Sequence, residues 1–381
     1  MRVVWLRVAV TWGLIAALLL SWKLWTSSRF YPQTPVLPFL KPAPFPVDEL
    51  LFAGLLVLAA LIAIVRKPAI LISALVAVAV VLALFDQSRW QPWIYQYLFM
   101  LLALRTDRPE VSLNTCRLII ICTYFWSGLQ KLSANFAEDV FAWLAEPVTR
   151  YLPAAIHSLV HSMGVAAPFI EAGMAVGLLF RKTRSAAVLL AIGMHAFILM
   201  GIGPWGHNSN TVVWPWNLVM IVCVWLLFWR TADFNPADIL WVKQSIVHKL
   251  VLVLFGIAPL LSFFNLWDSY LSSALYTPNK NKGTLYVSDS VFGKLPEKVQ
   301  DYATDEGPNV NGIDISDWSF SELNVPPYPE IRIYKNIART LCTYATQASD
   351  VRLVVKEKTA LVAGGRTLTY DCRQLAAANF R

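Results

Sequence analysis

The chain has 381 residues, of which 57% are hydrophobic and only 15% are charged. Soluble domains carry about 25% charged residues, so this composition indicates an integral membrane protein and excludes an ordinary soluble fold. The net charge of +8 does not indicate nucleic-acid binding, because the thirteen basic residues from Leu266 onward balance thirteen acidic ones. We therefore expect the excess charge in the short loops of a membrane domain, and no nucleic-acid partner.

Nine apolar stretches follow one another, and each predicts a membrane-spanning helix. They cover residues 8–25, 50–65, 69–85, 90–104, 118–132, 165–180, 186–202, 212–229 and 250–264. The first is interpreted as an uncleaved anchor, because no small-residue cleavage motif follows it. With the N-terminus in the cytoplasm, thirteen basic residues fall on the inner side and six on the outer side, as the positive-inside rule requires. We expect a multi-pass protein of a bacterial inner (cell) membrane, whose C-terminal region is periplasmic or extracellular.

This pattern predicts three domains. Residues 1–47 form the signal-anchor helix and a proline-rich connector, and residues 48–265 form the transmembrane domain. Residues 266–381 form an extracytoplasmic α+β domain that is long enough for its own core. The fold class is therefore an all-α polytopic membrane protein of about nine transmembrane helices with a C-terminal α+β domain. In that domain we expect strands over residues 285–287, 331–334, 351–356 and 359–369, helices over 295–303 and 337–346, and a hairpin turn at 363–365.

The loop between the fifth and sixth spans has its own helical periodicity. Apolar residues recur every four positions, which predicts an amphipathic helix within residues 136–163 that rests in the outer membrane interface. A shorter helix over residues 154–162 carries His157 and His161. Their i, i+4 spacing is that of a two-histidine metal site, but no third ligand is evident, so no metal is predicted.

The five cysteines fall into two groups. Cys342 and Cys372 lie in the predicted outer domain, where an oxidising compartment would allow a disulfide between them. Spacing alone does not establish that pairing. The other three lie in or beside predicted spans and are expected to be buried thiols: Cys116, Cys122 and Cys223.

Three ionisable residues within the predicted spans are the candidate catalytic groups. Lys131 lies near the outer end of the fifth span, and Glu171 and His195 each lie about 10 Å from the outer ends of the next two. Because sequential helices are usually neighbours, the three could share one pocket in the outer leaflet. An ionisable residue at membrane depth is costly, so each is a site candidate by default.

Polar residues near these positions are candidate ligand-binding groups: Tyr124, Ser127, His207, Asn208 and Asn217. Two interpretations of Lys131 stay open. In the functional one, a lysine beside Glu171 or His195 acts as a base or contacts an anion or a quinone. In the structural one, Lys131 and Glu171 form an ion pair that links two helices, and His195 bonds to a neighbour.

The run YFWSGLQKL, residues 124–132, resembles a motif of vitamin K-dependent gamma-carboxylases and their bacterial relatives, the horizontally transferred transmembrane (HTTM) domain. DoxX- and MauE-like membrane proteins have a similar Gly-x-x-Lys-Leu helix and a later glutamate placed like Glu171. The similarity extends over about residues 86–229, where the DQSRW run and Met194-His195 also match. In the carboxylases, the lysine that matches Lys131 is regarded as the base that deprotonates reduced vitamin K.

The departures from that family concern the reaction more than the fold. The carboxylases have a histidine after an Asn-Asn pair where this chain has Gln91-Pro92-Trp93, and Lys-Lys where it has Gln130-Lys131. The resemblance therefore implies a helical membrane fold with a quinone- or lipid-accessible pocket, and a quinone as the possible cofactor. The alternative hypothesis is a non-catalytic membrane scaffold whose outer domain binds a periplasmic protein.

Overall fold

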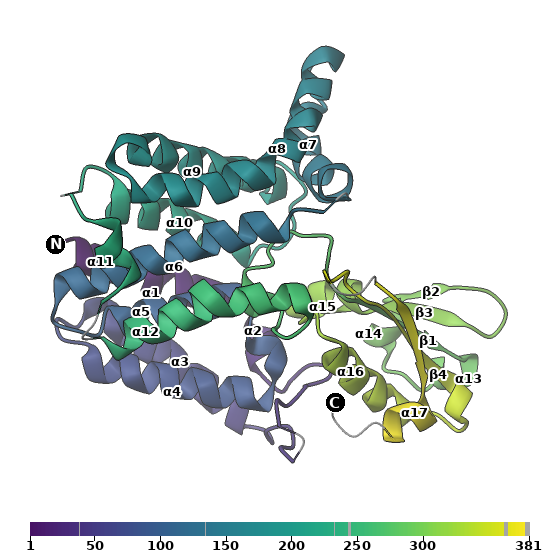
Figure 1. Ribbon diagram of the computed structural model, residues 1–381. Coiled ribbons are helices and arrows are strands. Elements are labelled where there is room, and N and C mark those ends of the chain that lie inside the picture. Colours follow the sequence, from purple (N-terminus) through teal and green to yellow (C-terminus); the bar gives the residue numbers. More distant parts are fainter. Residues whose placement is uncertain (38, 134, 232, 243–244, 362–364, 378–381) are drawn as a thin grey trace. The chain divides into compact units, whose positions relative to one another are not determined.

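The computed structural model describes residues 1–37, 39–133, 135–231, 233–242, 245–361 and 365–377, without the side chains of residues 154 and 155. The protein is mostly helical, with one small antiparallel sheet (Figure 1). Five of the described helices are long and apolar enough to cross a membrane: Arg2–Leu20, Val47–Ile64, Ile156–Leu179, Arg181–Ile202 and Ile246–Phe264. Two further apolar helices are shorter, Ala69–Phe85 and Val213–Phe228. These helices indicate association with a membrane, and nine crossings stay a prediction.

The chain forms two compact units, and neither is one continuous stretch. The first contains residues 1–20, 55–77 and 92–279, and the second contains residues 21–54, 78–91 and 280–381. Helices α3 (Val47–Ile64) and α4 (Ala69–Phe85) contribute residues to both.

The first unit is a helical bundle. Its other helices are α1 (Arg2–Leu20), α5 (Pro92–Ala103), α6 (Pro109–Gln130), α7 (Ala142–Thr149), α8 (Ala154–Leu179), α9 (Arg181–Ile202), α10 (Val213–Phe228), α11 (Pro236–Leu240) and α12 (Ile246–Val251), and α12 continues helically to Phe264. The predicted fifth span becomes α6, which begins nine residues earlier, since Pro109 and Glu110 suit a first helical turn. The polar first turns explain why α6 is absent from the five apolar helices.

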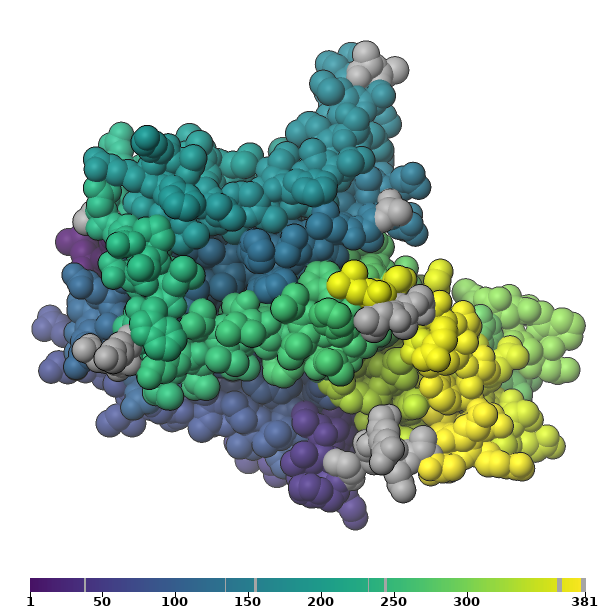
Figure 2. Space-filling model, in the orientation of Figure 1, coloured from purple at the N-terminus to yellow at the C-terminus, as the bar shows by residue number. Residues whose placement is uncertain are grey.

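The segment after α6 differs from its prediction. A π-helical turn (Phe136–Phe141) runs into α7, and the helix predicted within 136–163 is therefore interrupted at residues 150–153. The short helix predicted over 154–162 and the span over 165–180 are instead one helix, α8. Gly164 lies within α8. Because it has no side chain, Phe141 and Ala137 can approach its backbone closely. The first turns of α8 stand clear of the unit's other helices (Figure 2), and Leu159 is 63% exposed.

The second unit contains the sheet, with the antiparallel order β2-β3-β1-β4-β5. The strands are β1 (Lys282–Val287), β2 (Ala303–Asp305), β3 (Asn311–Asp314), β4 (Val351–Lys356) and β5 (Thr367–Asp371). The helices wholly within this unit are α2 (Trp22–Trp25), α13 (Asp289–Phe292), α14 (Glu297–Gln300), α15 (Ile315–Leu323), α16 (Ile331–Cys342) and α17 (Cys372–Ala377). Alternate residues of β1 and β4 are buried, and Gly283 of β1 admits the ring of Tyr334 on α16.

Of the four strand predictions for this region, two match, one was wrong and one matches at its end. The predicted strands over 285–287 and 351–356 are β1 and β4. Residues 331–334 belong to α16, because the buried residues Ile333, Ile337 and Leu341 recur at helical spacing. Of the strand predicted over 359–369, the described residues form a strand at the end, where β5 begins. The predicted turn at 363–365 lies largely outside the described residues. The helix predicted over 295–303 shortens to α14, and strands β2 and β3 were not predicted.

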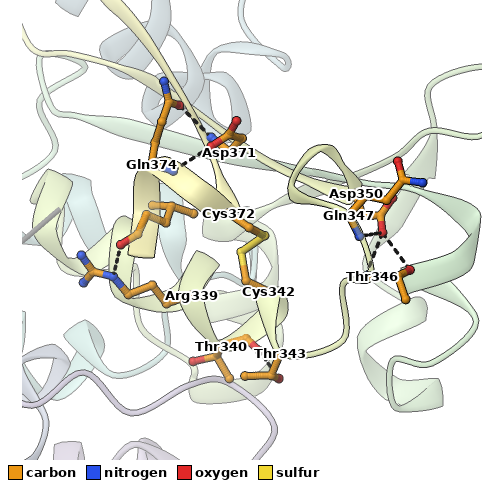
Figure 3. The surroundings of a disulfide bond; sticks show 11 residues. Arg339, Thr340, Cys342, Thr343, Thr346, Gln347, Asp350, Asp371, Cys372 and Gln374 are labelled. Carbon is orange, nitrogen blue, oxygen red and sulfur yellow. Dashed lines mark hydrogen bonds between the residues drawn. A yellow bond between two sulfur atoms is a disulfide. The ribbon is translucent and has the colours of Figure 1, made fainter. Parts of the chain in front are cut away.

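Cys342 and Cys372 form a disulfide that joins the end of α16 to the start of α17 (Figure 3). Arg339 of α16 also donates to the carbonyl oxygen of Leu375 at 2.8 Å. The bond therefore fastens the last helix to the helix that packs against the sheet.

We expect the variant Cys342→Ser/Cys372→Ser to lose stability. The bond closes a loop of 30 residues, and the chain-entropy model gives about 3–4 kcal/mol for a loop of that length. Denaturant unfolding of the full chain, followed by far-UV circular dichroism, measures the loss. The matched control is Cys116→Ser, a buried free thiol, and equal losses in both variants would contradict a specific role of the bond.

Two buried ion pairs hold the non-contiguous segments of this unit together. Arg29 pairs with Asp86, and Arg89 pairs with Asp48, with all four side chains at most 1% exposed. The Asp86 carboxylate also accepts hydrogen bonds from the backbone N–H and hydroxyl of Thr34. Asp86 and Arg89, in the DQSRW run, are therefore structural links of this unit.

We expect part of this unit's stability to be lost in acid. Burial alone would raise the pKa of the Asp86 carboxyl, but the Arg29 and Arg89 guanidinium groups outweigh burial and lower that pKa from its ordinary value. As pH falls, the unfolded chain therefore binds the proton at a higher pH than the folded chain does. The contribution of Asp86 to the free energy of unfolding is complete above about pH 4 and is lost as pH falls through the folded-state pKa. Denaturant unfolding between pH 7 and pH 3 should show a shallower acid loss for Asp86→Asn than for the wild type. Equal slopes would contradict the assignment.

Candidate functional site

Lys131 is the residue that ends α6. Its backbone N–H bonds to the carbonyl oxygens of Gly128 and Leu129, so it caps the helix. The sequence had placed it within the predicted span over residues 118–132. A cation there is favoured by the helix dipole. The ammonium Nζ donates to Glu171 Oε2 at 2.8 Å, to Ser127 Oγ at 2.6 Å and to the Ser127 carbonyl oxygen at 3.3 Å. Its three N–H groups therefore have three acceptors.

The ion pair depends on a close contact between α6 and α8. A Cβ atom on Gly128 would lie 2.6 Å from the backbone nitrogen of Ala172 and 2.7 Å from the carbonyl oxygen of Pro168. Only a glycine lets the two backbones come this near. Glu171 stands between these two α8 residues in sequence, so the same contact brings its carboxylate to Lys131. The side chains of Lys131 and Glu171 are 8% and 10% exposed.

A second hydrogen-bonded group connects three helices. Tyr124 Oη of α6 lies 2.8 Å from His195 Nε2 of α9, and His195 Nδ1 lies 2.8 Å from Asn217 Oδ1 of α10. The Asn217 amide donates from Nδ2 to the carbonyl oxygen of Val213, which fixes Oδ1 as the acceptor for His195. His195 Nδ1 must then donate. In a neutral imidazole Nε2 is left to accept, so the Tyr124 hydroxyl donates to it.

The two groups lie on one face of α6. Tyr124, Ser127 and Lys131 follow at i, i+3 and i+7, which places them along the same side of the helix. Glu171 is close enough to act electrostatically on both Tyr124 and His195. The site is thus a row of buried polar side chains from four helices, with an ammonium–carboxylate pair at one end and a phenol–imidazole–amide chain at the other.

Two residues of this neighbourhood were not predicted. The buried hydroxyl of Tyr276 interacts with the Asn217 side chain but lies outside hydrogen-bond geometry. Tyr276 follows the last predicted span and carries no pattern that could have marked it. Gln130, next to Lys131, donates to Ser262 Oγ at 2.6 Å and ties α6 to the helical segment that continues α12.

Other predicted residues lie elsewhere. His207 stacks on the ring of Trp143 at 4.2 Å and bonds to the Trp143 carbonyl oxygen, so it belongs to the contact with α7. Asn208 is exposed and has a positive φ of 47°. His157 and His161 stack on each other at 4.4 Å. Among the described residues, no three His, Cys, Asp or Glu side chains gather in a way that could hold a metal ion.

The row of polar groups is suited to proton transfer and to the binding of a ligand oxygen. Tyr124 and His195 can exchange a proton over 2.8 Å. Lys131 can stabilise negative charge that develops nearby in this low-dielectric surrounding. No family model, no curated protein and no solved structure matches the chain.

Proposed function

We propose that the first unit binds a quinone or another isoprenoid lipid and exchanges a proton with its oxygen, as part of a quinone-linked redox role. We further propose that the chain belongs with the gamma-carboxylase, HTTM and DoxX-like membrane proteins of bacterial inner membranes. The observation that carries the proposal is the row of buried polar side chains, from four helices, that lies along one face of α6. Ionisable groups at membrane depth are costly, so each is a functional-site hypothesis by default.

The proposed chemistry uses the groups in order. A ligand hydroxyl that reaches Tyr124 would give its proton to the phenol oxygen as Tyr124 passes its own proton to His195 Nε2. The imidazolium that forms would be stabilised by Asn217 and by the nearby Glu171 carboxylate. Lys131, held as an ammonium by Glu171, would stabilise the ligand oxyanion.

A second candidate is a membrane scaffold whose C-terminal domain binds a periplasmic partner. The observation that favours it is the complete set of acceptors around Lys131 Nζ, which is what a structural ion pair needs. The disulfide of the C-terminal region supports placing that region outside the cytoplasm in either case, because disulfides persist in oxidising compartments.

The test is lipid extraction and mass spectrometry of the purified full chain, wild type beside His195→Gln. The matched control is His248→Gln, because His248 is also buried and also bonds to a hydroxyl of α6, that of Thr115 at 3.0 Å. We expect a quinone or isoprenoid in the wild type and in His248→Gln, and at least a tenfold loss in His195→Gln. Equal loss in both histidine variants would indicate a general packing defect. A wild type that stays empty even after incubation with menaquinone would support the scaffold.

A further inference from the structure

A second polar cluster lies about 21 Å along α6 from Lys131. Here Arg2 of α1 and Arg117 of α6 bond to the C-terminal end of α10. Nearby, Arg184 of α9 donates to the carbonyl oxygens of Leu178 and Leu179, at the end of α8, at 3.2 Å. Arg2 donates to the carbonyl oxygens of Leu226, Trp229 and Arg230, at 3.0–3.2 Å, and Arg117 donates to that of Leu227 at 2.9 Å. These carbonyls suit cations because the helix dipole is negative at this end. None of these four acceptors carries a full charge.

Two of these guanidinium groups share one aromatic ring. Arg117 lies 4.3 Å and Arg184 3.6 Å from the centre of the Phe234 ring. Both residues are buried, at 7% and 5% exposed. Arg2 and Arg184 are near enough to repel Arg117 electrostatically. Like charges brought together in a low-dielectric site leave an attraction for an anion.

Exposed cations continue this cluster to the surface. Arg181 and Lys182 open α9, whose first turn has no acidic residue. Cations at a helix N-terminus are repelled by the positive end of the helix dipole. An anion at this position would be attracted by the cations and by the helix N-terminus. Arg230 is exposed at the end of α10. Within the described chain, the one carboxylate that pairs with any of these residues is that of Asp233, with Arg181. One paired carboxylate is too little to neutralise these basic residues.

We propose that this arginine cluster binds the phosphate of an acidic phospholipid. Apolar side chains flank it: Phe180, which directly precedes α9, is 52% exposed, and Trp225 is 46% exposed. Trp225 stacks on Trp229, and tryptophans of this kind mark a membrane interface. A soluble phosphate would use the cations alone, whereas a phospholipid also covers these rings with its acyl chains. Basic pockets between membrane helices are known to accept such headgroups.

The test is native mass spectrometry of the full chain in neutral detergent with equimolar phosphatidylglycerol and phosphatidylcholine. We expect the phosphatidylglycerol adduct to dominate in the wild type. Lys182→Gln/Arg230→Gln, which removes two exposed cations, should reduce that preference by roughly fivefold for each cation. The matched control is Arg105→Gln/Arg108→Gln, which removes two exposed cations outside the cluster and should leave the preference unchanged.

Three results would overturn the proposal. The first is equal binding of the two lipids to the wild type. The second is an equal reduction in the control pair, which would show attraction by net charge alone. The third is displacement of phosphatidylglycerol by millimolar inorganic phosphate, which would assign the cluster to soluble phosphate.

Discussion

Lys131→Met alone should destabilise the first unit by about 3–5 kcal/mol, because it leaves the Glu171 carboxylate buried without its partner. Adding Glu171→Gln should bring the free energy of unfolding back to within about 1 kcal/mol of the wild type, since no buried charge remains. Denaturant unfolding of the full chain in mixed micelles, followed by tryptophan fluorescence, measures both values. Asp233→Asn, which breaks the exposed pair with Arg181, is the control and should have no measurable effect.

The double variant also separates the two candidate functions. If Lys131 and Glu171 only join α6 to α8, the stable double variant should behave like the wild type in ligand content. If they act on a ligand, the double variant should fold and still lose it. A single variant as stable as the wild type would refute the ion-pair account. A double variant as unstable as the single one would show that packing, and not charge, is what Lys131 supplies.

The sequence predicted the charged part of the site because a charge is conspicuous in an apolar run. Lys131 and Glu171 could be singled out, and the structure brings them to 2.8 Å. Their sequence positions did not establish which of the two readings applies, because contact geometry depends on how the helices cross. The crossing is set by Gly128, a residue whose effect appears only when the opposing backbone is known.

The hydrogen-bonded chain was harder to predict. Tyr124, His195 and Asn217 come from three helices, and polar residues in apolar helices do not indicate their partners. His207 and Asn208 were candidate ligand-binding groups because of their loop position beside the predicted spans, whereas His207 stacks on Trp143. Which polar residues interact depends on which of them are buried together, and sequence spacing does not indicate burial.

In the second unit, the errors came from short elements. Residues 331–334, read as I-R-I-Y, alternate as a strand does, but the apolar spacing that continues to Leu341 is helical. Strands β2 and β3 have three and four residues, too few for periodicity to be detected. They are strands because β3 forms backbone hydrogen bonds with the edge of β1, and β2 forms them with β3. Pairing across the sheet, and not local propensity, determines these segments.

Gly128→Ala should disrupt the site through α6–α8 packing without changing any polar group. The added Cβ would lie 2.6 Å from a backbone atom of Ala172 and 2.7 Å from one of Pro168. Backbone atoms within a helix cannot relieve such a clash by a rotamer change, as a flexible side chain can. We expect a loss of about 1–3 kcal/mol from overpacking. We also expect loss of bound ligand, because the separation of the two helices moves Glu171 away from Lys131.

Gly173→Ala on α8 is the matched control, because no atom lies within 4 Å of the Cβ that it would add. Both substitutions gain about 1 kcal/mol in helix propensity, so the difference between them isolates the contact at Gly128. Unfolding in mixed micelles should place Gly173→Ala at or above the wild type, and Gly128→Ala below it. If the two variants were equally stable, the close approach of α6 and α8 would not be what holds Lys131 against Glu171. If Gly128→Ala were unstable yet kept its ligand, the ligand site would have to lie away from this helix contact.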